Sequence, residues 1–473
     1  MTEESSGRLP EPAVDTIAAV ATAPGPGAVA LVRLSGACAV DILDALTSDD
    51  ALTSDHGEGA PARSPRLLRI EEPGTGELLD RALVTIFRGP HSYTGEDMVE
   101  ISCHGGWLVP SLVLEACLAC GARSADPGEF TRRAVLHGKM DLVQAEAVLD
   151  LVEGRSRALH GSAVFRLERG LSRRIAELRE ELIGLEANLV HHIDFPEEDD
   201  APVPLDRVLA SASGLRDRLD ELLATAPEGE LLREGALTVL AGPPNSGKSS
   251  LYNALLGEER AIVTEVPGTT RDALEVVVSL GGFPFRIVNT AGIRETDEVV
   301  ERLGVEVARR YLERADLVLF CVESHKDIGP GEREFLEGLG DVPVVLLRTK
   351  SDLVDGEAEH DPPTPGAREV VSLSVVDGTG LGRLRKLLPS LVYGGLVRTG
   401  VSVPALTRRR QTEGVRSARD HVAVFIEDLE GGIPAEMAAT HLRPAETALE
   451  ELLGVISTDE ILDRIFHDFC IGK

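Results

Sequence analysis

The segment VLAGPPNSGKSSL, residues 239–251, constrains the fold of this chain more than any other stretch. It fits the phosphate-loop pattern G-x-x-x-x-G-K-S with Gly242, Gly247, Lys248 and Ser249, and it stands between an apolar strand pattern and a helical pattern. In that setting a glycine-rich turn points backbone N–H groups at phosphate oxygens. Lys248 can then reach the β and γ phosphates, and the Ser249 hydroxyl can hold Mg²⁺. The segment therefore predicts a nucleotide site between a strand and a helix.

Short apolar runs separated by helical patterns predict a parallel sheet covered by helices around this site. The runs are LTVLAG, FRIVN, DLVLFCV and VPVVLLR, and the alternation ends near Leu391. Helical patterns flank it on both sides. Upstream, one helix face is indicated by Leu167, Leu171, Ile175, Leu178, Leu182, Leu185 and Leu189. Neither flank alone predicts a complete bundle, so we expect the α/β domain to be inserted into a helical domain.

The N-terminal region has a different pattern, with strands predicted in TIAAVATA, AVALVRLSG, RALVTIFR and MVEISCHGG, and a helix that ends at Gly121. A chain of 473 residues should hold about three domains. We therefore predict an α/β plus all-α fold in four segments: an N-terminal α+β domain at 1–140, a first helical part at 141–230, the inserted P-loop domain at 231–392 and a second helical part at 393–473.

Further motifs identify guanine as the base. GTTRD follows at the distance of switch I, where Thr270 can supply a second Mg²⁺ ligand, and NTAG begins at Asn289 in the switch II position. TKSD places the Asp352 carboxylate where it can accept hydrogen bonds from guanine N1–H and the N2 amine, two donors that adenine lacks. SVVDGTG begins at Ser374 with the last expected base contact. The five motifs in this order predict a GTPase.

Three positions depart from the usual motifs. Asn289 stands where an aspartate normally holds a Mg²⁺-bound water, and it keeps an acceptor oxygen but not the charge. Thr349 stands where asparagine is usual, and Val375 where alanine is common. We expect guanine binding to survive these changes, whereas the strength of Mg²⁺ binding stays open.

Composition limits the partners and the compartment. The net charge of −31 argues against broad binding to nucleic acid, so an RNA contact needs local basic patches. Thr131–Arg133 and Thr407–Gln411 are candidates, although each also fits an ordinary solvated helix face. No apolar run approaches the roughly 20 residues of a membrane span, the start of the chain is too acidic for a signal peptide, and six cysteines do not form a disulfide framework. A cytoplasmic protein without a membrane segment is predicted.

The chain ends with HDFCIGK directly after a helical stripe of Ile461, Leu462, Ile465, Phe466 and Phe469. We therefore expect the tail to be docked, and it carries the thiol of Cys470, for which a buried structural role is the simplest interpretation. Cys117 and Cys120 form a CxxC without a second pair, so an apolar helix is favoured over redox or metal chemistry. His104 is either a structural turn residue or a base.

Nearly the whole chain resembles the MnmE (TrmE) family of tRNA-modifying GTPases. The resemblance rests on DTIAAVATAPGPGAVALVRLSG, YTGEDMVEISCHGG, DPGEFTRRAVLHGKMDLVQAEAV, DFPEED, LLREG, the guanine motifs and the terminal FCIGK. It implies a GTP-hydrolysing subunit that works with the FAD-dependent protein MnmG. Together they would add an aminomethyl or carboxymethylaminomethyl group at C5 of the wobble uridine of certain tRNAs, with methylene-tetrahydrofolate as one-carbon donor. The alternatives are a ribosome-assembly or signalling switch, and a scaffold that no longer hydrolyses GTP.

The resemblance also implies sites and partners. The N-terminal domain would bind a methylene- or formyl-tetrahydrofolate through Arg33, Glu100 and Lys139, joined by Lys473, and it would form the homodimer, with a heterotetramer expected together with MnmG. The tail would place Cys470 beside this pocket as a nucleophile, an acid or a packing residue. In the P-loop domain Glu301 would orient the attacking water, and K⁺ would be held by Asn245, Thr264, Val266 and Thr269. The predicted nucleotide site comprises Asn245, Ser246, Gly247, Lys248, Ser249, Ser250, Thr264, Glu265, Val266, Pro267, Gly268, Thr269, Thr270, Asn289, Thr290, Ala291, Gly292, Thr349, Lys350, Ser351, Asp352, Ser374, Val375 and Val376.

Overall fold

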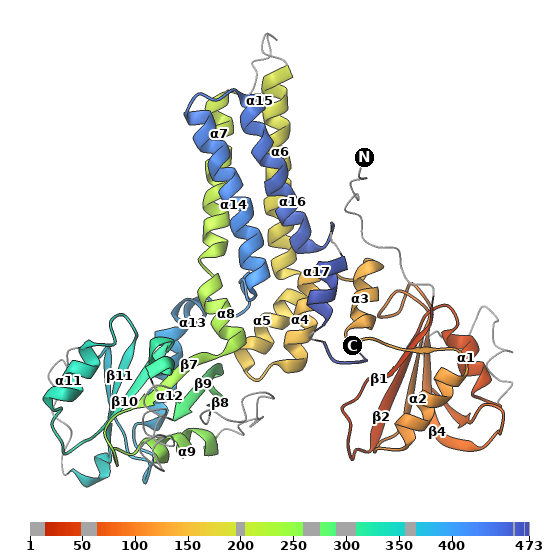
Figure 1. Ribbon diagram of the computed structural model, residues 1–473, viewed down its shortest axis with the longest axis horizontal. Helices are drawn as coiled ribbons and strands as arrows, with labels where there is room; N and C mark the ends of the chain where they lie inside the picture. Colours follow the sequence, from red (N-terminus) through yellow and green to blue (C-terminus); the bar gives the residue numbers. More distant parts are fainter. Residues whose placement is uncertain are drawn as a thin grey trace. The chain divides into compact units, whose positions relative to one another are not determined.

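A computed structural model describes residues 15–48, 64–194, 204–258, 275–289, 309–354, 366–456, 459–467 and 469–472 (Figure 1). The chain forms two compact units. The first combines residues 1–149 with residues 446–473, and the second comprises residues 150–445. The C-terminal tail therefore belongs to the same unit as the N-terminal strands.

The first unit is built on a mixed sheet with the strand order β3-β4-β5-β2-β1-β6. The strands are β1 (Ile17–Val20), β2 (Val29–Ser35), β3 (Arg66–Glu71), β4 (Leu78–Phe87), β5 (Met98–His104) and β6 (Arg123–Ser124). All neighbours are antiparallel except β1 and β6. Helices α1 (Ala39–Ala45) and α2 (Val109–Ala119) share one buried core with the sheet. The four predicted strands and the predicted helix are confirmed, whereas β3 and the two-residue β6 were not predicted.

Two further helices, α3 (Glu129–Leu136) and α17 (Asp459–Phe466), complete this unit, and α4 (Leu142–Glu153) and α16 (Leu442–Leu453) lead out of it. Phe466 and Phe469 are buried in one cluster with Val135 of α3. Beyond them the Gly128 N–H donates a 3.3 Å hydrogen bond to the carbonyl of Cys470. The predicted docking of the tail is confirmed.

The helices of the second unit include α5 (Arg157–Leu167), α6 (Gly170–Asp194), α7 (Leu205–Leu223), α8 (Ala226–Glu234), α14 (Arg409–Glu430) and α15 (Ala435–Ala438). Figure 1 shows α6, α7 and α14 side by side as a long helical arm, and contacts of α7 with both α6 and α14 confirm it. The apolar stripe from Leu171 to Leu189 is buried as predicted. Leu167, however, belongs to α5. The predicted helix begins too early because Arg169 adopts a left-handed φ of 65° and the ring of Phe165 occupies the space where a side chain at Gly170 would lie.

The P-loop part of the second unit has the strand order β12-β11-β10-β7-β9-β8. The strands are β7 (Ala236–Ala241), β8 (Glu275–Leu280), β9 (Phe283–Asn289), β10 (Leu317–Glu323), β11 (Val344–Thr349) and β12 (Glu369–Ser372). Among these described strands only β8 pairs antiparallel, as a hairpin with β9. The described helices of this part include α9 (Lys248–Glu258), α11 (Pro330–Glu337), α12 (Leu381–Val392) and α13 (Gly394–Thr399). The predicted parallel sheet and the predicted fold class are confirmed.

The helices in the described ranges include none with both the length and the apolar character that crossing a membrane requires.

Candidate functional site

The phosphate loop joins β7 to α9, as the sequence predicts. Gly242 adopts a φ of 130°, and a Cβ at this position would lie 2.2 Å from the carbonyl oxygen of Cys321 in the neighbouring strand. Glycine is therefore required both by the backbone conformation and by the close approach of β10. Asn245, exposed at the tip of the loop, has a φ of 62°, which asparagine tolerates better than most residues. The loop is thus shaped by the residues of the motif itself.

Lys248 lies at the start of α9 and folds back over the loop. Its Nζ donates hydrogen bonds of 2.9 Å to Gly242 O and 2.6 Å to Pro243 O. Ser249 and Ser250 are exposed in the first turn of the same helix. A positively charged amine and two hydroxyls therefore gather at a helix N-terminus, an arrangement that favours a bound phosphate.

The predicted base-binding motifs lie at the carboxyl ends of neighbouring strands. Thr349 ends β11, and the short helix η2 (Ser351–Leu353) follows, with Asp352 exposed on it. Ser374 follows β12 and is buried, with its Oγ accepting a 3.2 Å hydrogen bond from the Val376 N–H. Val375 lies between them and is half-buried. The Ser351 N–H also donates to Leu373 O at 3.2 Å, so the two base motifs are fastened to each other.

Lys350 has a left-handed φ of 57°, and its Nζ lies 3.1 Å from Glu323 Oε1 at the end of β10. Hydrogen bonds from Lys350 and Lys326 hold the pKa of Glu323 below its usual value. Glu323 was not predicted as a site residue. The available signal was an acidic residue at the carboxyl end of a fully buried strand, the edge where ligands of such sheets bind.

The remaining predicted nucleotide residues fall into two groups. Asn289 ends β9 beside Leu240 of β7 and is buried. The switch I residues Thr264 to Thr270, the switch II residues Thr290 to Gly292, the predicted water-orienting Glu301 and the terminal Lys473 lie outside the described residues.

In the first unit, Arg33 and Glu100 face each other across β2 and β5. Arg33 Nη2 and Nε donate hydrogen bonds of 2.7 and 3.1 Å to Glu100 Oε1, and Nη1 donates to the tail carbonyl of Gly472 at 3.4 Å. The guanidinium also lies 5.5 Å from the ring centre of Tyr93 and 5.7 Å from that of Phe130. The structure therefore brings two predicted residues to the docked tail and adds two aromatic residues that were not predicted.

Lys139, a third predicted residue of this site, lies just after α3. Its Nζ donates a 2.7 Å hydrogen bond to the carbonyl of Pro90. It therefore contacts the loop between β4 and β5, the loop that also holds Tyr93.

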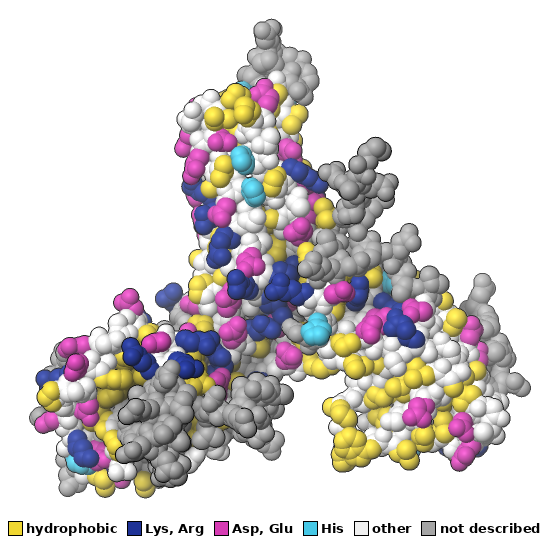
Figure 2. All heavy atoms as spheres, viewed as in Figure 1, with side chains coloured by type: hydrophobic (Ala, Val, Ile, Leu, Met, Phe, Trp, Pro, Cys, Tyr) yellow, Lys and Arg dark blue, Asp and Glu magenta, His cyan; other side chains and the backbone are white. Residues whose placement is uncertain are grey.

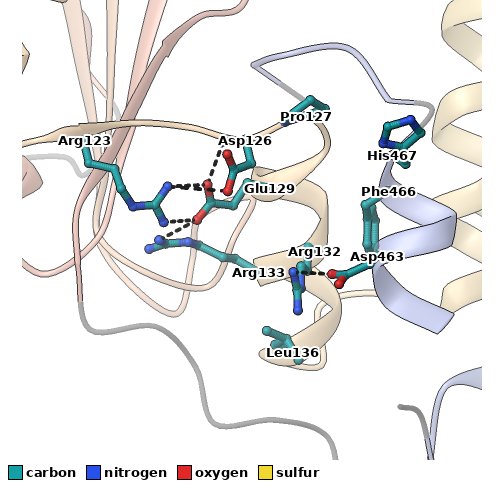
Figure 3. Close-up of a pocket in the computed structure, with 10 residues that line it drawn as sticks. All are labelled: Arg123, Asp126, Pro127, Glu129, Arg132, Arg133, Leu136, Asp463, Phe466 and His467. Atoms are coloured by element: carbon teal, nitrogen blue, oxygen red, sulfur yellow. Dashed lines mark hydrogen bonds and ion pairs between the residues drawn. The ribbon is translucent and has the colours of Figure 1, made fainter. Parts of the chain in front are cut away.

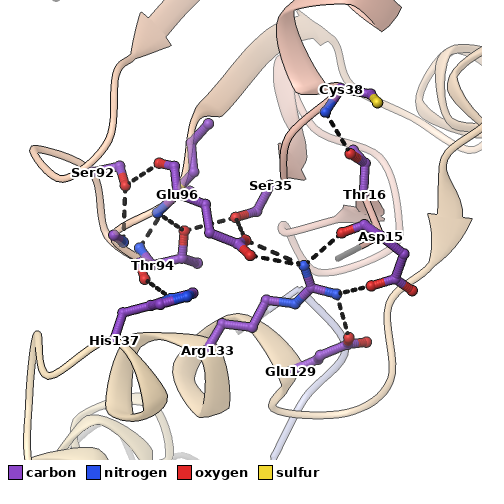
Figure 4. A network of polar contacts seen from close by, with 12 residues as sticks. Asp15, Thr16, Ser35, Cys38, Ser92, Thr94, Glu96, Glu129, Arg133 and His137 are labelled. Carbon is purple, nitrogen blue, oxygen red and sulfur yellow. Dashed lines mark hydrogen bonds and ion pairs between the residues drawn. The ribbon is translucent and has the colours of Figure 1, made fainter. Parts of the chain in front are cut away.

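Arg133 anchors a buried polar network under α3 (Figure 4). Its guanidinium, only 2% exposed, donates to Asp15 Oδ1 at 2.7 Å, to Glu129 Oε1 at 2.9 Å and to Glu96 Oε1 at 3.1 Å. The segment TRR was predicted either as an RNA-binding patch or as a solvated helix face. Both interpretations are wrong for Arg133, because three carboxylates enclose its charge.

Arg132, by contrast, points into a cavity of about 440 Å³ between α3 and α17 (Figure 3). It lies 2.9 Å from Asp463 Oδ1, while Arg123 on the other wall donates to both oxygens of Glu129. Three arginines and three acidic side chains line this cavity, so their charges balance.

Three residues with open roles can now be placed. Burial raises the pKa of Cys117 to about 12, so it does not form a thiolate at neutral pH. His104 Nδ1 lies 2.8 Å from Asp80 Oδ1, and both belong to the sheet. Cys470 is exposed, so the interpretation as a buried structural cysteine is wrong.

Comparisons with known proteins agree with this architecture. A family model described as the GTP-binding protein TrmE N-terminus matches residues 16–139, and one described as the MnmE helical domain matches residues 142–470. The tRNA modification GTPase MnmE of Moorella thermoacetica is 42% identical over 468 residues, which cover 97% of this chain and 99% of that protein. The chain belongs to the MnmE family. The MnmE protein of Heliobacterium modesticaldum is 41% identical, again over 468 residues, 97% of this chain and 99% of that protein.

Membership of the MnmE family confirms the resemblance seen in the motifs and the enzyme class that it implies, a GTPase. Among solved structures, the G domain of the T. maritima FeoB iron transporter is 28% identical, and the match covers 32% of this chain and 93% of that chain with a TM-score of 0.23.

Proposed function

We propose that this chain is the GTP-hydrolysing subunit of a complex that modifies C5 of the wobble uridine in certain tRNAs. The group added would be of the aminomethyl or carboxymethylaminomethyl type. The observation that carries the proposal is that a chain of this family combines a phosphate loop and guanine motifs with a second charged and aromatic site, around Arg33, in a separate unit. A switch that only binds partners needs the first site but has no use for the second.

The proposed nucleotide site uses Lys248 at the phosphates and Asp352 at guanine, with Glu301 orienting water. Ser249 and Thr270 would hold Mg²⁺. The family resemblance assigns K⁺ to Asn245, Thr264, Val266 and Thr269. The exposed positions of Asn245 and Ser249 at the loop and the first turn of α9 fit these cations, which would neutralise charge that develops on the phosphates.

The proposed folate site uses Arg33, Glu100, Lys139 and Lys473. Its residues fit a reduced folate, because a carboxylate can accept from pterin N–H groups, cations suit the glutamyl carboxylates and aromatic rings suit a flat heterocycle. Tyr93 and Phe130 supply such rings within 6 Å of Arg33. The folate would supply the one-carbon unit, and these side chains would hold and orient it.

The proposed partners follow the family. Homodimerisation would use the first unit, where Val29, Trp107 and Leu108 are exposed; Figure 2 shows apolar side chains across the visible surface of this unit. Single exposed apolar residues are common, but a group of large ones is typical of an interface. The FAD-dependent MnmG protein would complete a heterotetramer that acts on tRNA in the cytoplasm. The four domain segments at 1–140, 141–230, 231–392 and 393–473 remain our proposed boundaries.

GTP turnover tests the nucleotide part. We expect hydrolysis in K⁺ and little in Na⁺ at matched ionic strength, and we expect Lys248→Ala to abolish it. Equal rates in both salts would exclude the K⁺ site, and no turnover in either would favour the scaffold alternative.

Calorimetric titration of the full chain with formyl-tetrahydrofolate tests the second site. Arg33→Ala should remove binding, whereas Arg69→Ala is a matched control, because Arg69 also pairs with a glutamate on the same sheet but is half exposed. If wild-type protein does not bind the folate, the ribosome-assembly or signalling alternative is favoured.

A further inference from the structure

Thr349 is buried beneath the proposed nucleotide site and ties two loops together. Its side chain is 2% exposed, and Oγ1 lies 2.8 Å from the carbonyl oxygen of Ser246 in the phosphate loop. The same oxygen lies 3.2 Å from the carbonyl of Val322 in β10. Both neighbours are acceptors, so the hydroxyl hydrogen points toward them. Thr349 is therefore a tether between the base loop and the phosphate loop.

A hydroxyl carries a single hydrogen. Because the tether uses it, Thr349 has no donor left for a nucleotide base. An asparagine, the usual residue at this position, carries two amide N–H groups and could serve the Ser246 carbonyl and a base acceptor at the same time. The substitution by threonine keeps the first contact and gives up the second.

Guanine presents donors on N1 and N2 and acceptors at O6 and N7. Asp352 is exposed and forms no hydrogen bond with the described part of the chain, so its carboxylate is available for the two donors. Lys350 of the same motif also carries N–H donors, but its Nζ lies 3.1 Å from Glu323 Oε1. Of these three side chains, Thr349 and Lys350 are thus held by other groups of the protein, whereas the Asp352 carboxylate faces solvent.

We propose that this chain recognises guanine through its N1 and N2 donors and leaves N7 without a side-chain contact from Thr349. Thr349 acts as a positioning residue for the phosphate loop. The inference rests on the proposed GTP site and concerns how that site selects its base.

Nucleotide competition against a fluorescent GDP, with the full chain, tests the inference. We expect 7-deaza-GDP, in which N7 is replaced by a C–H, to bind within about twofold of GDP, since no net hydrogen bond is lost. IDP lacks the N2 amine and should bind at least about tenfold more weakly, because a hydrogen bond to a charged carboxylate is lost. A preference of fivefold or more for GDP over 7-deaza-GDP would overturn the inference. Equal binding of IDP and GDP, or no binding of GDP, would instead contradict the proposed guanine site.

Two variants test whether the residue at position 349 decides if guanine N7 receives a hydrogen bond. Thr349→Asn supplies the second donor and should create a preference of about fivefold for GDP over 7-deaza-GDP. Thr349→Val keeps the branched shape but removes the hydroxyl, so it should weaken GDP and 7-deaza-GDP by the same factor. If Thr349→Asn binds GDP but still treats the two nucleotides alike, position 349 cannot reach N7, and the threonine is not the reason that N7 lacks a side-chain contact.

Discussion

The hydroxyl of Tyr393 donates a 2.6 Å hydrogen bond to the carbonyl oxygen of Pro284 at the start of β9. The same hydroxyl lies 3.1 Å from Leu231 O in α8 and accepts a 3.2 Å hydrogen bond from the Ala236 N–H. Burial raises the pKa of Tyr393, so the hydroxyl keeps its proton. Two chain connections join the P-loop sheet to the flanking helices, one from α8 into β7 and one after α12. Tyr393 lies in the second connection and holds both the first connection and the β8–β9 hairpin.

Tyr393→Phe removes this hydroxyl and keeps the ring, which stacks on Phe283 at 4.9 Å. We expect the variant to lose about 1–3 kcal/mol of stability, because buried backbone groups at positions 236 and 284 lose a partner. Differential scanning calorimetry should show a lower melting temperature. Ser390→Ala, in the last turn of α12, is the control, because its hydroxyl is exposed and bonded only to its own helix. An equal melting temperature for wild type and Tyr393→Phe would mean that water or a neighbour replaces the hydroxyl.

Asp150, like Tyr393, is a buried group that holds several elements of the second unit together. Its carboxylate is 1% exposed and lies 2.8 Å from Arg166 and 2.6 Å from Arg408, with Arg233 at 3.6 Å. Asp150→Asn leaves these guanidinium groups without their common counter-charge, so we expect a loss of about 3–5 kcal/mol. Glu413→Gln, which breaks the exposed pair with Arg409, should cost less than about 1 kcal/mol. Similar changes in melting temperature for the two variants would show that burial does not set the strength of the Asp150 pairs.

Burial decides which strands could be predicted from the sequence. Strands β7, β10 and β11 are buried along their whole length, so their uninterrupted apolar runs identified them. The edge strands β8 and β12 and the strand β3 are only partly buried. Their mixed composition gives no clear signal, because edge strands are stabilised by pairing with a neighbour that a local pattern does not contain.

The local sequence also does not show which partners surround a charged residue. Adjacent arginines look alike in the sequence, yet Arg409 is exposed, Arg408 pairs with the buried Asp150, and Arg133 is enclosed by carboxylates. The partners of Arg133 come from positions 15, 96 and 129, and only the last is near in sequence. Tyr93 and Phe130 near Arg33 were missed for the same reason, since they come from a loop and a helix that meet only in the folded unit.

Glu129 should contribute a measurable pH dependence. Burial alone would raise its pKa, but hydrogen bonds from Arg123, the Asp126 N–H and Arg133 outweigh this and hold the pKa below the ordinary 4.5. Since the folded-state pKa is the lower one, the stabilisation is complete above the ordinary pKa and is lost as the pH falls through the folded-state value. We therefore expect Glu129→Gln to melt well below wild type at neutral pH.

The difference between these melting temperatures should shrink at acid pH, below about 4. Melting curves of both proteins across this range check the prediction. Glu77→Gln is the control, because Glu77 is exposed in the connection between β3 and β4 of the same unit, and its difference from wild type should stay small at every pH. A constant gap between Glu129→Gln and wild type would show that these hydrogen bonds do not depend on the charge of the carboxylate.

Asn289→Asp tests the unusual switch II motif. Asn289 is buried at the end of β9, beside the strand that leads into the phosphate loop. An aspartate restores a charged acceptor near the proposed metal site, and charged acceptors form hydrogen bonds about twice as strong as neutral ones. We expect GTP hydrolysis to need less Mg²⁺ and to proceed at the same rate or faster. Asn289→Ala should need more Mg²⁺. A severe loss of turnover in Asn289→Asp, with normal folding, would mean that the surroundings of Asn289 have adapted to a neutral side chain.

Cys470→Ser asks whether the docked tail has a chemical role. The backbone carbonyl of Cys470 accepts a hydrogen bond from Gly128, the neighbouring tail carbonyl of Gly472 accepts one from Arg33, and the thiol is exposed. The contacts that hold the tail are thus made by its backbone and by Phe469, so a serine should leave the docking intact. Serine nearly preserves the shape of cysteine. It is a much poorer nucleophile, because the reactive form of cysteine is the thiolate and serine has no thiol. We expect normal folding, normal dimerisation and normal GTP turnover, with strongly reduced modified uridine in cellular tRNA, measured by nucleoside mass spectrometry.

Phe469→Ala provides the contrast, because it removes a buried side chain and should loosen the tail while the thiol is kept. Full modification by Cys470→Ser would show that the tail acts through its backbone contacts alone and that the thiol takes no part in the reaction.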